Sequence, residues 1–516
     1  MSWFDDWALT LAVFIPLVGM AIVMLIPSAE EQAIKTVALL ASLVTLAVGI
    51  GVLADFNYQK TSTLQFQVDK SWISLIHARY HLGVDGISLP MIILTMVIVP
   101  LCIIYSWDHF PEPHNPKAFL ALILLLEVGM IGTFVSLDLV LFFIFFEVVL
   151  LPMFFMIGVW GGPNREYASI KFFLFTLFGS ALMLVSFLAI YFLSKQPTFD
   201  IVHLSQFAGS GIGRGTQILL FAGLFLGFAI KVPMFPFHTW LPDAHTEAPT
   251  VGSVILAAVL LKLGTYGFIR IALPILPQGA QVWAPWIGVL AVIGIIYGAL
   301  CCLAQTDMKR LIAFSSVSHM GFVMLGIASL TTFGINAAVF GMVAHGLITG
   351  LLFFVAGSMQ HRYHTREMSR LGGLLISAPK MGWILGFAAM ASLGLPGLAG
   401  FWGEFPAVLS AFDPSKVANG LLGNTHSALP TFRTFMVIAA VGTVLAAGYL
   451  LWMYQRVAMG TPKEEFEHAH LHDVSTSEWI AWLPLILGTV VFGLFPNLIF
   501  SITNGAAEHV TKVFGG

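Results

Sequence analysis

The sequence predicts an all-α integral membrane protein with about 14 transmembrane helices. Of its 516 residues, 58% are hydrophobic and only 9% are charged, and the mean hydropathy is +0.91. No soluble domain of this length would stay in solution with so few charges. Apolar runs recur along the whole chain, each close to the roughly 20 residues that a helix needs to cross a bilayer. Two of these runs are interrupted by proline beside an ionisable residue, which makes them candidate functional segments.

Fourteen apolar segments are long enough to span the membrane, and we number them in chain order. They lie near 8–26, 34–54, 87–106, 118–136, 138–158, 168–193, 216–231 with a continuation, 249–273, 283–304, 310–329, 334–356, 380–400 with a continuation, 432–455 and 479–502. The stretch 64–84 mixes aromatic residues with single charges, so we expect it to lie along the membrane surface. The basic stretch 360–373 is expected to be a loop between helices 11 and 12.

Helix 7 is predicted to be broken inside the membrane. Its apolar run from Ile218 to Ile230 covers only about 20 Å at 1.5 Å per residue, which is short of a hydrocarbon core of about 30 Å. Lys231 stands at the end of the run, and Pro233 and Pro236 follow it. Each proline removes a backbone donor and clashes with a continuing helix. Because broken backbone at membrane depth survives only where protein or water satisfies it, Lys231 is a candidate functional residue.

Helix 12 shows the same pattern, which indicates an internal symmetry. The apolar run Met381–Leu395 ends at Pro396, and Glu404 lies just beyond. The broken helices are five apart and so cross the membrane in opposite directions, which predicts two inverted five-helix repeats, helices 4–8 and 9–13. The alternative is that proline and glycine are simply common in membrane helices. We expect one polytopic domain, 1–516, made of N-terminal helices (1–117), a first repeat (118–278), a second repeat (279–460) and a C-terminal helix (461–516).

Three ionisable residues lie near the middle of predicted spans: Glu147 in helix 5, Lys231 in helix 7 and Lys262 in helix 8. A charge at mid-membrane costs roughly 3 kcal/mol on insertion scales. Pairing Glu147 with one lysine would cancel most of this cost, and such a pair would by itself only hold helices together. The other lysine is left over, and a lysine whose carboxylate partner comes and goes can take up and release a proton. We therefore predict that all three residues take part in proton transfer.

Histidines supply the other polar positions inside the spans. His319 in helix 10 lies among serines, and His345 lies in helix 11. A lone histidine in a helix is usually a satisfied polar residue, but two near mid-span are suited to passing protons across the membrane centre. His238 and His245 fall in the loop after the break in helix 7. There they either take part in proton uptake or gating, or are solvated loop residues.

Several other classes of site are not supported by the sequence. The three cysteines lie in apolar segments without the Cys/His spacing of zinc or iron–sulfur sites. A histidine-rich stretch near 464–473 is expected to be a solvated loop rather than a metal site. No nucleotide-binding signature occurs, and a net charge of −3 does not suggest nucleic-acid binding. We predict no metal and no cofactor in this chain.

The distribution of Lys and Arg predicts the orientation. Twelve of these residues lie in loops after odd-numbered helices and eight in loops after even-numbered helices. The positive-inside rule then puts the first set of loops in the cytoplasm and both termini outside it. The acidic start of the chain, with Asp5 and Asp6, agrees with this orientation.

Three motifs give a family resemblance. KVPMFPFHTWLPDAHTEAPT from Lys231, DMKRLIAFSSVSHMG from Asp307 and GLPGLAGFWGEF from Gly394 resemble the antiporter-like membrane subunits of respiratory complex I. The resemblance covers roughly residues 85–460. The same family includes subunits of multisubunit cation/proton antiporters and of membrane-bound hydrogenases. The acidic Glu404, and a chain that ends after helix 14, are similar to the M type of subunit rather than to the L and N types.

The resemblance implies a proton-pumping module. It implies that Glu147 and Lys231 form a switching pair, that Lys262 is the central relay and that Glu404 ends the path. It also implies that flavin mononucleotide and iron–sulfur clusters belong to partner subunits, that related L-type and N-type subunits are neighbours, and that the chain lies in the inner membrane of a bacterial cell.

Two functional hypotheses stay open at this point. The first is a proton-translocating subunit of NADH:quinone oxidoreductase with no redox centre of its own. The second is a subunit of a multisubunit cation/proton antiporter or of a membrane-bound hydrogenase. A third class, a quinone-binding redox enzyme, has no residue cluster in its favour, although an apolar quinone groove leaves little trace in a sequence.

Overall fold

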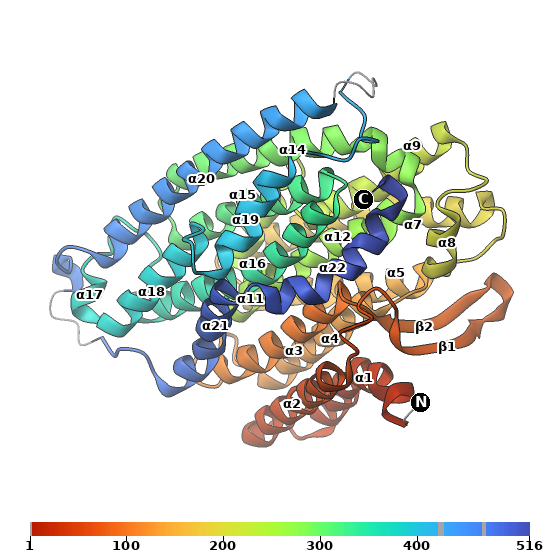
Figure 1. Cartoon of the computed structure of the whole chain (residues 1–516). Coiled ribbons are helices and arrows are strands. Elements are labelled where there is room, and N and C mark those ends of the chain that lie inside the picture. The colour runs from red at the N-terminus through yellow and green to blue at the C-terminus, as the bar shows by residue number, and fades with distance from the viewer. Residues whose placement is uncertain (1–2, 422–427, 467–470, 516) are drawn as a thin grey trace.

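The computed structural model describes residues 3–421, 428–466 and 471–515, and these form a bundle of membrane-length helices (Figure 1). Within these residues, 13 helices are long and apolar enough to cross a membrane. The remaining predicted span, helix 12, is present as two shorter helices. Each of the fourteen predicted spans therefore has a counterpart. Two histidines of the stretch 464–473, His468 and His470, lie outside the described residues.

The spans of the N-terminal part are α1 (Trp3–Leu25), α2 (Glu31–Asp55), α3 (Ser88–Tyr105), α4 (Pro116–Val135), α5 with α6 (Leu139–Val148 and Leu150–Trp160), α7 (Arg165–Leu193) and α9 (Arg214–Lys231). The eighth span joins α11 (Thr250–Ile255), the π-helical turn η2 (Leu256–Leu260), α12 (Leu261–Gly267), the π-helical turn η3 (Phe268–Ala272) and α13 (Leu273–Ile275). The later spans are α14 (Pro277–Leu303), α15 (Met308–Ala328), α16 (Thr332–Tyr363), α18 with α19 (Pro379–Ser392 and Ala399–Ser410), α20 (Ala428–Ala458) and α21 (Thr476–Leu494). Shorter helices are α8 (Ile201–Phe207), α10 (Trp240–Glu247), α17 (Leu374–Ser377) and α22 (Asn497–Thr511).

Side-chain caps explain where several spans begin. Asn115 accepts a hydrogen bond from the backbone N–H of Ala118 at the start of α4. Asp138 caps α5, and Asp307 caps α15 in the same way. Such caps satisfy backbone donors that the first turn of a helix leaves unpaired. At the start of α21, Ser475 completes a reciprocal capping box.

Both predicted helix breaks are confirmed. α9 ends at Lys231, and α10 begins only at Trp240. α18 ends at Ser392 and α19 begins at Ala399, with Pro396 in the segment between them. The prolines thus interrupt the helices where the sequence places them, while the repeat relation between the two halves stays a prediction.

The stretch 64–84 forms a β-hairpin, which the sequence did not predict. Strands β1 (Gln65–Ile73) and β2 (Ala78–Val84) pair antiparallel. Most of β1 is exposed and shows no alternation of buried and exposed residues, so the usual period-two pattern of a strand is missing. His81 of the hairpin lies 2.7 Å from the carboxylate of Asp200, and this pair ties the hairpin to the start of α8.

The two most buried spans lie in the middle of the bundle. Nearly every residue of α15 and α16 is buried. In contrast, α7 and α20 expose large apolar side chains along one face, such as Phe178 and Val444. In a membrane protein such faces meet lipid or a partner subunit, because the bilayer is itself an apolar solvent.

Both described ends of the chain lie at the end of the bundle that carries the hairpin (Figure 1). The ring of Phe4 in α1 lies 6.3 Å from the ring of Phe66 in β1. A cavity of about 580 Å³ is lined jointly by residues of the hairpin, α8 and the C-terminal segment 509–513. An even number of membrane crossings also puts the two ends of the chain on the same side of the membrane.

The predicted last span, 479–502, is split near Pro496, since α21 ends at Leu494 and α22 follows.

Candidate functional site

Lys262 lies on α12 in the centre of the bundle, and none of its surface is exposed. Its ammonium group donates to the carbonyl of Ala257 and lies 2.7 Å from Nδ1 of His345 on α16. Ala257 belongs to the π-helical turn η2, and π-helical turns inside α-helices are frequent at functional sites. The sequence predicted mid-span positions for Lys262 and His345, and the structure adds that the two side chains are in direct contact.

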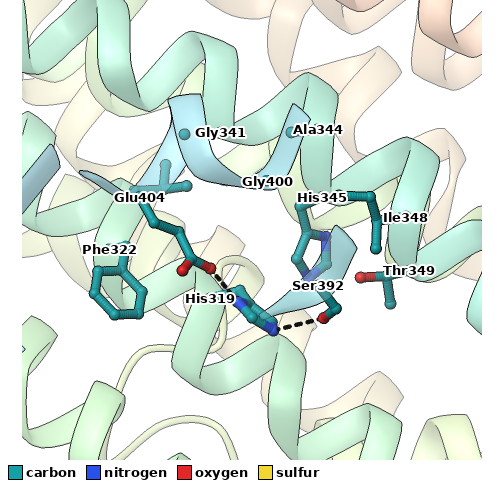
Figure 2. A pocket seen from close by; sticks show the side chains of 12 residues that line it. His319, Phe322, Gly341, Ala344, His345, Ile348, Thr349, Ser392, Gly400 and Glu404 are labelled. Carbon is teal, nitrogen blue, oxygen red and sulfur yellow. Dashed lines mark hydrogen bonds and ion pairs between the residues drawn. The ribbon is translucent and has the colours of Figure 1, made fainter. Parts of the chain in front are cut away.

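His319 on α15 connects three further elements. Its Nδ1 lies 2.5 Å from Oε1 of Glu404 on α19, and its Nε2 lies 3.1 Å from Oγ of Ser392 and 3.2 Å from the hydroxyl of Tyr449. Figure 2 shows Glu404 and Ser392 on opposite sides of the imidazole ring. A hydroxyl can either donate or accept a hydrogen bond. Both ring nitrogens of His319 therefore lie within hydrogen-bond distance of a polar side chain.

A small cavity separates the two histidines. The ring centres of His319 and His345 are 5.9 Å apart, and a cavity of about 20 Å³ is lined by both rings together with Thr349, Ser392 and Glu404 (Figure 2). One water molecule needs roughly 10 to 15 Å³ on this measure, so the cavity admits a single water. We call the four side chains Lys262, His345, His319 and Glu404 the buried polar line.

Lys231 and Glu147 lie to one side of this line. Lys231 is at the end of α9 and is 3% exposed, whereas Glu147 is half-buried on α5. Across the described part of the chain, no ion pair joins the two residues. Instead the Lys231 ammonium lies 5.0 Å from the centre of the Phe146 ring. The close pairing expected from the cost of burying these charges is therefore not formed in this structure.

His238 and His245 are buried rather than solvated. His245 is 0% exposed and stacks on Phe353 with ring centres 4.6 Å apart. Among the described residues, neither of its ring nitrogens has a hydrogen-bond partner. His238 is 2% exposed and lies against Phe235 and Tyr297. The interpretation of these histidines as solvated loop residues is therefore wrong.

A polar cavity of about 330 Å³ opens at the end of the bundle opposite the hairpin. Its lining includes His109 after the end of α3, His361 in the last turn of α16, Glu247 of α10 and Lys309 of α15. Lys309 is only 2% exposed, and its ammonium donates to the carbonyl of Ala248. Lys309 is thus a buried lysine at the edge of the predicted span 310–329, in the second position of α15.

An ion pair closes the other end of the eighth span. Arg270 lies 2.6 Å from the carboxylate of Asp85 and also donates to the hydroxyl of Tyr266, one turn after Lys262. Asp85 precedes α3 and lies outside the membrane spans. Burial alone would raise the pKa of Asp85, but the Arg270 guanidinium and backbone hydrogen bonds hold it below its usual range.

Some polar residues at these places escaped the sequence analysis. Glu127 is fully buried in α4, and both of its carboxylate oxygens lack a hydrogen-bond partner within the described residues. Its position in the apolar run of helix 4 was visible in the sequence and is the signal that would have found it. Tyr449 gave no such signal, because its contact with His319 joins residues 130 positions apart.

Two families match this chain. The family described as "NADH:quinone oxidoreductase/Mrp antiporter, TM" matches residues 136–453. The family described as "NADH-ubiquinone oxidoreductase chain 4, amino terminus" matches residues 11–133. Together they cover every residue of the buried polar line as well as Glu147 and Lys231.

Individual relatives agree with both families. NADH-quinone oxidoreductase subunit M of Rhodobacter capsulatus is 41% identical over 98% of this chain and 96% of its own length. The subunit of the same name from Rickettsia bellii is 40% identical over 98% of this chain and 99% of its own length. NADH-ubiquinone oxidoreductase chain 4 of Arabidopsis thaliana is 36% identical over 96% of this chain and 95% of its own length.

Solved structures share the fold. A chain of respiratory complex I from Thermus thermophilus superposes with a TM-score of 0.86 at 29% identity, covering 98% of this chain and all of its own. A chain of the Mrp complex from Dietzia sp. DQ12-45-1b gives a TM-score of 0.84 at 20% identity, covering 99% of both chains, which shows a common fold alone. From the two matching families and the relatives of about 40% identity, we conclude that this multi-pass membrane protein belongs to the family of NADH-quinone oxidoreductase subunit M.

Proposed function

We propose that this chain is the proton-translocating subunit of an NADH:quinone oxidoreductase in the inner membrane of a bacterial cell. It moves protons across the membrane while partner subunits, with their flavin and iron–sulfur centres, oxidise NADH and reduce quinone. Related L-type and N-type subunits would be its neighbours in the membrane. The observation that carries the proposal is the buried polar line, which brings four titratable side chains together from four different helices.

The contacts of this line suit stepwise proton transfer. Lys262 donates toward Nδ1 of His345, so a proton given up by the ammonium is received by the imidazole ring. The other ring nitrogen, Nε2 of His345, has no hydrogen-bond partner in the described chain. A single water in the cavity between the histidines would carry the proton to His319, which contacts Glu404 directly. Proton transfer needs hydrogen-bond reach or one intervening water, and each step meets this condition.

The polar cavity of about 330 Å³ supports proton uptake at the end opposite the hairpin. We propose that this end faces the cytoplasm, in agreement with the Lys and Arg count. His109 lines this cavity, and its buried Nδ1 has no hydrogen-bond partner among the described residues. His245 is close by in sequence to Ala248, the carbonyl partner of Lys309. We propose that His245 and His238, both buried, take part in proton uptake or gating.

The ion pair between Asp85 and Arg270 supports the direction of transfer. It lies between Lys262 and the hairpin end of the same span, where a fixed pair of charges resists the passage of a proton. A proton on Lys262 then leaves sideways, through His345 and His319 to Glu404. The break between α18 and α19 gives Glu404 freed backbone groups nearby, as expected for a discontinuous helix on an ion path.

Proton pumping by membrane vesicles tests the proposal. Lys262→Met keeps the length and packing of the side chain but removes the titratable amine, so we expect the assembled complex to lose most of its NADH-driven proton uptake. Lys195→Met, at an exposed loop position, serves as the matched control. Pumping in Lys262→Met equal to that of the control, at equal content of assembled complex, would contradict the proposal.

The fold shared with the Mrp complex makes a cation/proton antiporter component the second candidate. Purification in mild detergent separates the two candidates. Flavin and iron–sulfur absorbance in the purified complex supports the first. Their absence, together with proton movement that depends on added Na⁺ and not on NADH, supports the second.

A further inference from the structure

The ammonium of Lys231 meets an aromatic ring in this structure and not a carboxylate. Its Nζ lies 5.0 Å from the centre of the Phe146 ring, which is within the roughly 6 Å over which a ring face attracts a cation. Lys231 is 3% exposed and Phe146 is 2% exposed, so water hardly competes for this contact. A cation–π contact is strongest under such desolvated conditions.

Phe146 directly precedes Glu147 on α5. Consecutive residues of an α-helix point about 100° apart, so the ring and the carboxylate occupy two neighbouring sectors around the same helix. Lys231 faces this helix from the end of α9, and its side chain is a flexible four-carbon stem. A rotation of that stem would move the ammonium from the ring of Phe146 toward the carboxylate of Glu147.

The ring of Phe146 is held firmly in place. It stacks on Phe142 of the same helix, with ring centres 5.7 Å apart, and meets Phe228 of α9 edge-on at 6.2 Å. Phe228 lies one turn before Lys231 on the same helix, so the helix that carries the lysine also fixes the ring that receives it. A ring clamped on two sides offers its face to the ammonium at a constant position.

We infer that Phe146 is a positioning residue that provides a second seat for the charged Lys231, alternative to Glu147. The face of a benzene ring carries negative charge density and attracts an ammonium ion. With the ammonium on the ring, the carboxylate of Glu147 is left without its cation. With the ammonium on Glu147, the ring is empty. The inference rests on the proposed proton-translocating function, in which this exchange would be the switching step of Lys231 and Glu147.

Changing the negative charge density on the face of the ring tests the inference. Trifluorophenylalanine incorporated at Phe146 keeps the shape of the ring but weakens the negative charge of its face. Phe146→Trp strengthens that face, and Phe146→Leu removes it. Loss of the ring attraction shifts the distribution of the ammonium between its two seats by roughly tenfold. We therefore expect NADH-driven pumping per assembled complex to fall several-fold in the trifluoro and Leu variants and to be kept in the Trp variant.

Phe142 provides the matched control. It is a fully buried neighbour on the same helix that also contacts Phe228, and the same ring replacement there should leave pumping unchanged. Wild-type pumping in the trifluoro variant at Phe146, or an equal loss at Phe142, would overturn the inference.

A further variant separates this inference from the proposed function. If Lys231→Ala pumps normally, the proposed role of Lys231 in proton translocation fails. If Lys231→Ala stops pumping while the whole Phe146 series pumps as wild type, only the aromatic seat fails.

Discussion

Glu404 ends the buried polar line, and its carboxylate lies 2.5 Å from His319. A residue that ends a proton path must both accept and release a proton, so we expect Glu404→Gln to lose much of the pumping. Glutamine keeps the shape of the side chain and a hydrogen bond to His319 but cannot titrate. Glu404→Asp keeps a titratable group on a shorter stem and should retain part of the activity. Proton uptake by inverted vesicles, normalised to complex content, measures both variants.

A purely structural role for Glu404 predicts the opposite result for Glu404→Gln. If the carboxylate served only to hold His319 or to stabilise the restarting helix α19, glutamine would be tolerated because it still offers a carbonyl oxygen. A Glu404→Gln variant that pumps like wild type would therefore end the claim that this residue carries a proton.

The sequence predicted the members of the buried polar line but not their partners. Lys262, His319 and His345 stand out as polar residues within apolar runs, and such residues are costly unless they have a function. The hydroxyl of Tyr449 and the ring of Phe146 do not stand out, because tyrosine and phenylalanine are ordinary residues of a membrane helix. Their roles depend on contacts between distant segments. The cost of burying charge predicted a close pair of Glu147 with one lysine, and the family resemblance implied Lys231. In the structure the Lys231 ammonium lies over the Phe146 ring instead.

The close approach of α19 to α16 fixes the position of Glu404. A Cβ atom added at Gly403 would lie 2.6 Å from Cα of Gly341, a backbone atom of α16. Gly403→Ala should therefore push the helices apart, cost about 1 to 3 kcal/mol of stability and separate Glu404 from His319. We expect lower pumping and a lower melting temperature of the complex.

Gly448→Ala is the control for this element. Gly448 lies on an exposed face of α20, and a Cβ atom there would meet nothing within 4 Å. Thermal melting and proton uptake of this variant should match wild type. Equal behaviour of the Gly403 and Gly448 variants would show that α19 and α16 have room to adjust.

The hairpin is held by a pH-sensitive contact outside the membrane. Burial raises the pKa of Asp200, but hydrogen bonds from His81 and from the backbone N–H of His203 outweigh this effect and lower it. A lowered pKa in the folded state means that the contact stabilises the hairpin fully above the unfolded value of about 3.9 and that this stabilisation is lost as the pH falls through the lower, folded value.

Hydrogen exchange of the hairpin amides checks this prediction. In wild type, protection of residues 65–84, corrected for intrinsic rates, should be constant above about pH 4 and fall on further acidification. Asp200→Asn should show low protection at every pH. Asp55→Asn, an exposed carboxylate at the end of α2, is the control and should behave as wild type. Full protection in Asp200→Asn would mean that the strand pairing alone holds the hairpin.

The elements differ in how far the sequence determines them. Proline favours the two helix breaks, because the loss of a donor and a steric clash act locally. It does not determine them alone, since α3 and α14 continue through Pro100 and Pro285. The hairpin and the π-helical turns have no such local cause. β1 lies mostly exposed beside the bundle, and the hairpin is held by contacts such as that of His81 in β2 with Asp200, 119 positions away. The turn η2 lies in a run of Leu, Ala and Val, LAAVL, that by propensity would simply continue an α-helix.

For the molecule as a whole, the spans could be predicted from the sequence because hydropathy acts over about 20 residues at a time. Their arrangement could not, since lipid-facing and buried apolar residues look alike in a sequence. α1 and α15 are both apolar, yet only a minority of α1 residues are buried, whereas nearly every residue of α15 is buried. The order in which helices pack depends on small residues and polar contacts between distant spans.

The orientation of the molecule is the last prediction, and it is open to a direct measurement. Both ends of the chain lie at the hairpin end of the bundle, so one labelled position at the C-terminus decides the side of both. Twelve Lys and Arg residues against eight predict that this end lies outside the cytoplasm. This orientation would put the polar cavity lined by His109 and Lys309 on the cytoplasmic side, which is the proposed side of proton uptake.

Cysteine labelling with a membrane-impermeant maleimide makes the measurement, in a background where the three native cysteines are replaced by serine. Val513→Cys, at a position 40% exposed near the C-terminus, should react in intact spheroplasts. Lys463→Cys, in the exposed segment after α20 at the opposite end, should react only after lysis, which also shows that the site is accessible. The reverse result would mean that the opposite orientation is correct and that the cavity lies on the side of proton release. The path through Lys262, His345, His319 and Glu404 allows this, because it has the same contacts in both directions.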